Sequence, residues 1–119
     1  AAEGRFVSLA VHHNLHVQRP LRDRTGRLLD RDALRRRLSD APVGLVIHGH
    51  DHHEHEMTIA GRAPGGTLVV GCGSSSVHRP QHHRFGRFND YEIPGDPSGT
   101  LRIERWESRP DGGFERRDP

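Results

Sequence analysis

Residues 43–56 read VGLVIHGHDHHEHE, an apolar run of five residues that leads directly into a dense group of imidazoles. A short, uninterrupted apolar run predicts a strand that is buried on both faces of a sheet. Of the 11 His in this 119-residue chain, five lie in residues 48–55. The stretch therefore predicts a buried strand with a site at its carboxyl end, where clustered imidazoles indicate metal or proton chemistry.

The first 40 residues repeat this arrangement. The apolar run FVSLAV at 6–11 predicts another buried strand, and it leads into His12 and His13. Between the two strands, Asp30 is a favourable residue to precede a helix. That helix is expected to have Leu34 and Leu38 on its apolar side and its arginines, from Arg31 onward, mostly outside. A strand, a helix and a strand predict a parallel pair whose carboxyl ends meet at one edge, where ligands bind in α/β sheets.

From residue 56 the pattern becomes mainly β. Strands are expected at 56–60, 67–70, 88–93 and 101–106, with a polar loop at 77–86 and a turn at 94–99. We expect residues 1–108 to form one structural unit and residues 109–119 to be a polar, frayed tail. The fold class predicted is α/β, with one strand–helix–strand unit followed by several β-strands.

Composition excludes several classes of protein. No apolar run approaches the roughly 18 residues of a membrane-spanning helix, and the first 20 residues show no signal-peptide pattern. The single Cys72 excludes an internal disulfide framework and suits a cytoplasmic protein. The net charge is +2 and the charges are mixed, so no nucleic-acid-binding module is expected.

His50 and His52 are the best candidates for metal ligands. In an extended backbone this spacing places both rings on one side, roughly 6–7 Å apart. His12 joins them if the two strands are neighbours, and neutral imidazoles suit borderline divalent cations. Asp51 should point away from them. His48 lies inside the apolar run and is expected to be a packed residue. The histidines other than His12, His13, His50 and His52 are expected to be bystanders.

Two known metal-site patterns compete for this stretch. Gly44, His50, His52 and Glu56 fit the first half of the cupin pattern. That alternative makes the chain a mononuclear metal-binding β module. The later half of the cupin pattern, with a further Pro, Gly and His, does not follow.

The second pattern extends over more of the chain. In order, AVHHNL (10–15), GHDHH (49–53), LVVGCGSSS (68–76) and RFNDYEI (87–93) resemble the C-terminal half of the calcineurin-like metallophosphoesterase family. The resemblance covers most of residues 6–106 and implies the C-terminal part of a four-layer α/β sandwich. Asn14 stands where the family has Pro. The family places three further blocks first, D-x-H, G-D and G-N-H-[DE], and none of them precedes AVHHNL in this chain.

The resemblance implies a hydrolase in which two divalent metal ions, Mn, Fe or Zn, activate a phosphate mono- or diester for attack by water. By this resemblance His12 and His50 hold one metal, His52 holds the other, and His13 lies beside the substrate. The family's bridging Asp and its Asn ligand belong to the missing blocks. We therefore expect the chain to be inactive alone, to expose unpaired strand edges, and to need the N-terminal half of the domain as its partner.

Overall fold

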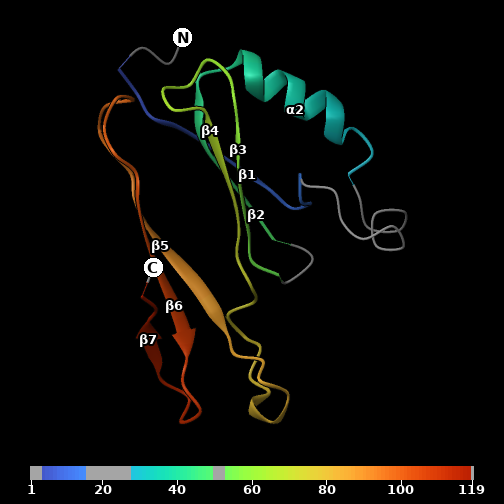
Figure 1. The fold of residues 1–119 in the computed structure, drawn as a ribbon, viewed down its shortest axis with the longest axis vertical. Helices are drawn as coiled ribbons and strands as arrows, with labels where there is room; N and C mark the ends of the chain where they lie inside the picture. The colour runs from blue at the N-terminus through green and yellow to red at the C-terminus, as the bar shows by residue number, and fades with distance from the viewer. Residues whose placement is uncertain (1–3, 16–27, 50–52, 119) are drawn as a thin grey trace.

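The computed structural model describes residues 4–15, 28–49 and 53–118. This part of the chain is mixed α/β, mostly strands in two sheets, with one α-helix (Figure 1). The elements in chain order are β1 (Val7–Val11), α2 (Arg31–Asp40), β2 (Val43–His48), β3 (His55–Ile59), β4 (Thr67–Gly71), the 3₁₀-helix η1 (Pro80–His82), β5 (Arg87–Glu92), β6 (Arg102–Ser108) and β7 (Phe114–Arg116). The α/β class expected from the sequence is confirmed at this level.

The first sheet contains the strands that precede the histidines. Its order is β1-β2-β4-β3, with β1 parallel to β2, β2 parallel to β4, and β3 antiparallel to β4. The predicted parallel pair is therefore correct, and Val11 lies opposite His48 in the β1–β2 register. Because three strands run the same way, their carboxyl ends meet at one edge of the sheet.

One face of this sheet is covered by α2 (Figure 1). Leu38 on the helix packs against Val46 and Val69 on the sheet, and all three side chains are buried. Arg31 was expected on the outside of the helix, but its side chain is buried at the helix start. Its main-chain N–H donates to the carbonyl of Leu28 over 3.1 Å. Within the described ranges no helix is long and apolar enough to cross a membrane.

The second sheet is antiparallel, in the order β5-β6-β7. Alternation along β5 and β6 gives it two different faces. One face carries polar side chains that contact the first sheet. The other carries three aromatic rings in contact, with Phe88 5.9 Å from Trp106 and 5.1 Å from Phe114 between ring centroids. The layers are therefore helix, four-stranded sheet and three-stranded sheet.

The polar tail expected at 109–119 contains a strand. β7 pairs with β6, and Ser108 lies opposite Phe114. A tight turn at 109–113 makes this possible, since Asp111 Oδ1 accepts a hydrogen bond of 2.9 Å from the Gly113 N–H and Gly112 adopts φ of 89°. The prediction of a frayed tail did not take into account that Asp111 and Gly112 form this turn.

Candidate functional site

His12 and Gly49, each the first residue after its strand, meet at the carboxyl edge of the four-stranded sheet. Gly49, the residue after β2, donates its N–H to the carbonyl oxygen of His12, the residue after β1, over 3.3 Å. The rings of His12 and His13 contact each other edge to face, with centroids 4.9 Å apart. The two strands are thus neighbours. This is the arrangement that the prediction of His12 as a metal ligand together with His50 and His52 requires.

His12 is held at the surface by a firmly anchored loop. The two residues that follow His13, Asn14 and Leu15, are 0% exposed, and Leu15 belongs to the apolar core. His12 itself is exposed and His13 is half-buried. The imidazole of His12 is therefore accessible to a ligand on a backbone that the core fixes in place.

The other two predicted metal ligands, His50 and His52, lie outside the described residues, and their role stays a prediction. In the part of the chain that the structure describes, no group of three or more His, Cys, Asp or Glu side chains is placed to hold a metal ion. His12 is the predicted metal ligand whose position is known, and His13 is the predicted substrate neighbour beside it.

His48 is packed, as its place inside the apolar run predicts. It is 6% exposed, and its ring lies against Gly71 on β4. A Cβ built on Gly71 would come within 2.5 Å of the ring carbon Cε1. Glycine at this position leaves room for the imidazole between β2 and β4.

Replacing Gly71 by alanine is expected to lower the free energy of unfolding by about 1–3 kcal/mol, because overpacking a buried site displaces its neighbours. Gly44→Ala is the matched control in the same sheet. There the three nearest atoms to the new Cβ all belong to the far end of the Phe6 ring, a half-buried side chain that can move more easily than the packed ring of His48. Urea denaturation of both variants measures the difference, and equal losses would contradict the proposed packing of His48.

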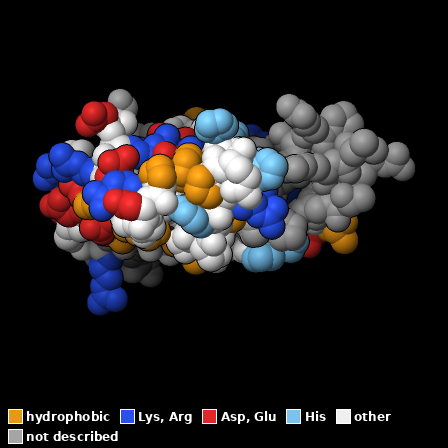
Figure 2. All heavy atoms as spheres, turned by 90° about the horizontal axis from the view of Figure 1, so that it is seen from below, with side chains coloured by type: hydrophobic (Ala, Val, Ile, Leu, Met, Phe, Trp, Pro, Cys, Tyr) orange, Lys and Arg blue, Asp and Glu red, His pale blue; other side chains and the backbone are white. Residues whose placement is uncertain are grey.

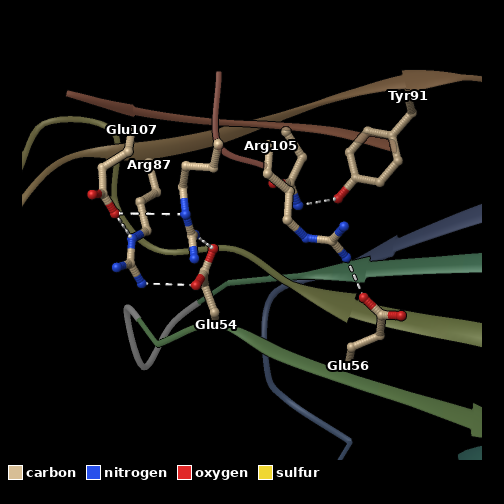
Figure 3. Close-up of polar contacts among 8 residues, drawn as sticks. Glu54, Glu56, Arg87, Tyr91, Arg105 and Glu107 are labelled. Carbon is tan, nitrogen blue, oxygen red and sulfur yellow. Dashed lines mark hydrogen bonds and ion pairs between the residues drawn. The ribbon is translucent and has the colours of Figure 1, made fainter. Parts of the chain in front are cut away.

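A group of paired arginine and glutamate side chains, the Arg–Glu layer, joins the two sheets beside this edge (Figure 3). Its members are Glu54, Glu56, Arg87, Arg105, Glu107 and Arg117. Arg87 donates from Nη1 to Glu54 over 2.7 Å and from Nε to Glu107 over 2.6 Å. Sequence reasoning missed this layer because Arg87 and Arg117 lie 33 and 63 residues from Glu54.

The Arg–Glu layer determines which carboxylates are available at the histidine edge. Glu54 binds both Arg87 and Arg117, and Glu56 binds Arg105. These carboxylates follow the second histidine block in sequence, yet their charges are already matched by guanidinium groups. They are poor candidates for the bridging ligands that two adjacent dications require.

An open groove of about 360 Å³ runs between the two sheets at the same edge. Ala10 and Ile47 line it from the four-stranded sheet, and Asn89 and Tyr91 line it from β5. The thiol of Cys72 lies at its border and is half-buried. Burial, and then the negative charge of Glu54, raise the pKa of this thiol.

Cys72 is expected to react slowly with iodoacetamide near neutral pH. The thiolate is the reactive form, and a raised pKa leaves less thiolate than in a free cysteine, whose pKa is about 8.5. The alkylation rate should therefore reach its plateau at a higher pH than that of a free cysteine. Glu54→Gln should move the midpoint downward, because one raising charge is lost while Arg87, which lowers the pKa, remains. A wild-type midpoint at or below that of free cysteine would contradict the assignment.

No family model matches the chain, and no match was found among curated proteins or among solved structures. The chemistry proposed for the histidine edge therefore rests on the residues of this chain and on the family resemblance of its sequence blocks.

Proposed function

We propose that the chain carries the histidine side of a dinuclear metal centre in a metal-dependent phosphoesterase of the calcineurin-like type. The observation that carries this proposal is the hydrogen bond from the Gly49 N–H to the His12 carbonyl, which places His12 beside the residue that precedes His50, at the carboxyl ends of parallel strands. In this proposal His12 and His50 hold one divalent metal ion, His52 holds the other, and His13 contacts the phosphate-ester substrate.

The layers of the fold support the proposal. A helix, a four-stranded sheet and a three-stranded sheet in successive layers are consistent with part of the four-layer sandwich that the resemblance implies. On the outer face of the three-stranded sheet, Phe88 and Phe114 are 37% and 39% exposed. Among the described strands, β1 is an edge with a neighbour on one side. An open edge and an uncovered aromatic face are what we expect of a domain completed by another polypeptide segment.

The three imidazoles that the sequence predicts as ligands, His12, His50 and His52, suit one divalent ion better than two. Imidazoles are good ligands for Zn²⁺, whereas an adjacent pair of dications also needs carboxylates to offset their charge. Glu54 and Glu56 are engaged by arginines, so we propose that the bridging carboxylates come from the family's N-terminal blocks. His12, His50 and His52 would hold the metals and His13 would orient the substrate, and the chemistry that the metals would supply is polarisation of the phosphate ester.

The cupin-like alternative is the second candidate. Cupins are double-sheet, antiparallel jelly rolls, whereas β1, β2 and β4 run parallel here, which favours the phosphoesterase. A mononuclear metal-binding module is still consistent with this edge, because imidazoles alone can hold one ion and the nearby carboxylates are bound by arginines. Metal stoichiometry separates the two, with one ion expected for the module and two for the completed phosphoesterase.

Hydrolysis of bis-p-nitrophenyl phosphate in the presence of Mn²⁺ tests the proposed function. The chain alone should give no turnover above buffer that contains Mn²⁺. The chain co-expressed with a segment carrying the D-x-H, G-D and G-N-H-[DE] blocks should hydrolyse the ester and lose that activity in His50→Ala. Turnover by the chain alone that disappears in His50→Ala would contradict the incomplete site, and inactivity of the completed form would contradict the function.

A further inference from the structure

A second pocket, of about 260 Å³, lies next to the groove at the loop between β4 and β5. It shares Arg87 and Gly73 with the groove, so it lies near the histidine edge. Its polar lining consists of His53, Ser74, His83, Arg84 and Arg87. The described side chains that line it thus include two guanidinium groups, two imidazoles and a hydroxyl, and no carboxylate.

Arg84 is the uncompensated cation of this pocket. It is exposed, and no carboxylate in the described part of the chain pairs with it. Arg87 is only partly engaged, since Nη1 and Nε bind Glu54 and Glu107 while Nη2 bonds to none of the described residues (Figure 3). A pocket with available guanidinium donors and no carboxylate in its described lining favours an anion whose oxygens accept several hydrogen bonds.

The frame of the pocket is held by main-chain hydrogen bonds. Arg79 and Arg84 bond to each other in both directions, at 2.8 and 3.1 Å. The Arg87 N–H donates to the carbonyl of Ser74 over 3.2 Å, which ties the two ends of the loop together. Between them His83 adopts a left-handed conformation with φ of 51°, which is uncommon for a residue other than glycine. A site built in advance loses less conformational freedom on binding.

The distribution of charged side chains on this side of the molecule also favours an anionic ligand. The β4–β5 loop lies at the bottom of Figure 1, and the view from below shows histidine and arginine side chains gathered there beside a small apolar patch (Figure 2). The acidic side chains visible in that view lie mainly toward the side of β7. An anion that approaches this end therefore meets mostly cationic and neutral groups.

We propose that this pocket binds a phosphate group, with Arg84 as its main cation and with Nη2 of Arg87 and the Ser74 hydroxyl as further donors. The Ser74 hydroxyl lies 3.0 Å from that of Ser76, and it keeps its own hydrogen for the phosphate when Ser76 donates in that bond. In the sheet order, β2 separates β4 from β1, so the carboxyl end of β4 lies about 10 Å from that of β1. This distance exceeds the size of one phosphate group. This step rests on the proposed function, in which one phosphate ester is hydrolysed at the histidine edge. The pocket then holds a second phosphate group that is not cleaved. The substrate class we propose is therefore compounds with two or more phosphate groups.

Calorimetric titration of the chain with inorganic phosphate in EDTA tests the pocket without any metal. We expect saturable one-to-one binding that is weakened at least about tenfold in Arg84→Ala, because a charge-assisted hydrogen bond is lost. Arg79→Ala is the matched control: it removes the same charge from the same loop, but Arg79 is exposed and does not line the pocket. Both variants keep the main-chain bonds between residues 79 and 84. Absence of saturable binding, or equal weakening in the two variants, would overturn the phosphate pocket.

A second titration, with Zn²⁺ present, tests the substrate class. Pentane-1,5-diyl bisphosphate, whose linker is long enough to reach both positions, should bind more tightly than inorganic phosphate, and both Arg84→Ala and His12→Ala should remove the difference. Phosphate binding in EDTA should be unchanged by His12→Ala. If phosphate binds in EDTA while His12 makes no contribution to Zn²⁺ binding, the pocket is supported and the proposed function is contradicted. If the bisphosphate has no advantage over phosphate, the two-phosphate substrate class is wrong.

Discussion

Replacing His12 by alanine is expected to lower the affinity of the chain for Zn²⁺ by at least about 100-fold. Even residues that only orient a ligand contribute about 10–100-fold to metal affinity, and His12 is proposed as a direct ligand. His12 is exposed, and its carbonyl accepts a hydrogen bond from the N–H of Gly49, the residue before His50 in the sequence. Competition with a fluorescent zinc chelator measures the affinity.

His82→Ala is the control for this loss. His82 is an exposed histidine in η1, away from the strand ends, and is expected to be a bystander. The control variant should bind Zn²⁺ within about twofold of the wild type. Both variants should unfold near the wild-type urea concentration, because each removes an exposed ring and exposed substitutions usually change stability by less than about 0.5 kcal/mol. Equal Zn²⁺ affinity in the two variants would show that His12 is not a ligand.

Leu38→Ala is expected to lower the free energy of unfolding by about 2–5 kcal/mol. Leu38 is 2% exposed and packs α2 against Val46, Ile59 and Val69 in the main core cluster. Small domains are stable by only about 5–15 kcal/mol in total, and the apolar core here is thin. A cavity beneath α2 should therefore leave a large fraction of the protein unfolded at moderate urea concentrations.

The matched control for the core substitution is Leu29→Ala. Leu29 is 85% exposed and lies just before the same helix, so removing its side chain should change stability by less than about 0.5 kcal/mol. Urea denaturation followed by circular dichroism measures both variants. A Leu38→Ala variant that is as stable as Leu29→Ala would mean that α2 does not pack on the sheet as described.

Most of the fold could be predicted because apolar patterning is a local signal. The run at 6–11 forms β1 and the run at 43–47 forms β2, and their parallel pairing follows from the helix between them. β7 was missed because its three residues are polar apart from Phe114, and its pairing with β6 depends on the turn at 109–113. A strand created by a turn leaves little periodic signal of its own.

Of the candidate site, the sequence could predict only the contacts that follow from the order of the strands. The meeting of His12 with Gly49 follows from two neighbouring parallel strands. The Arg–Glu layer and the phosphate pocket depend on how the two sheets face each other, and the sequence carries no local signal for that packing. Arg87 illustrates the difference, because it is one of 18 basic residues and only the structure places it between Glu54 and Glu107.

Long-range proton–nitrogen NMR of the imidazoles during a Zn²⁺ titration tests the metal site most directly, since it reports each ring separately. We predict that the ring nitrogens of His12 and His50 show coordination shifts in the first equivalent and those of His52 only as the second is added, while those of the other eight of the 11 histidines show none. Shifts confined to His78, His82 and His83, or no coordination shift at His12, would contradict a metal site at the carboxyl edge of β1 and β2.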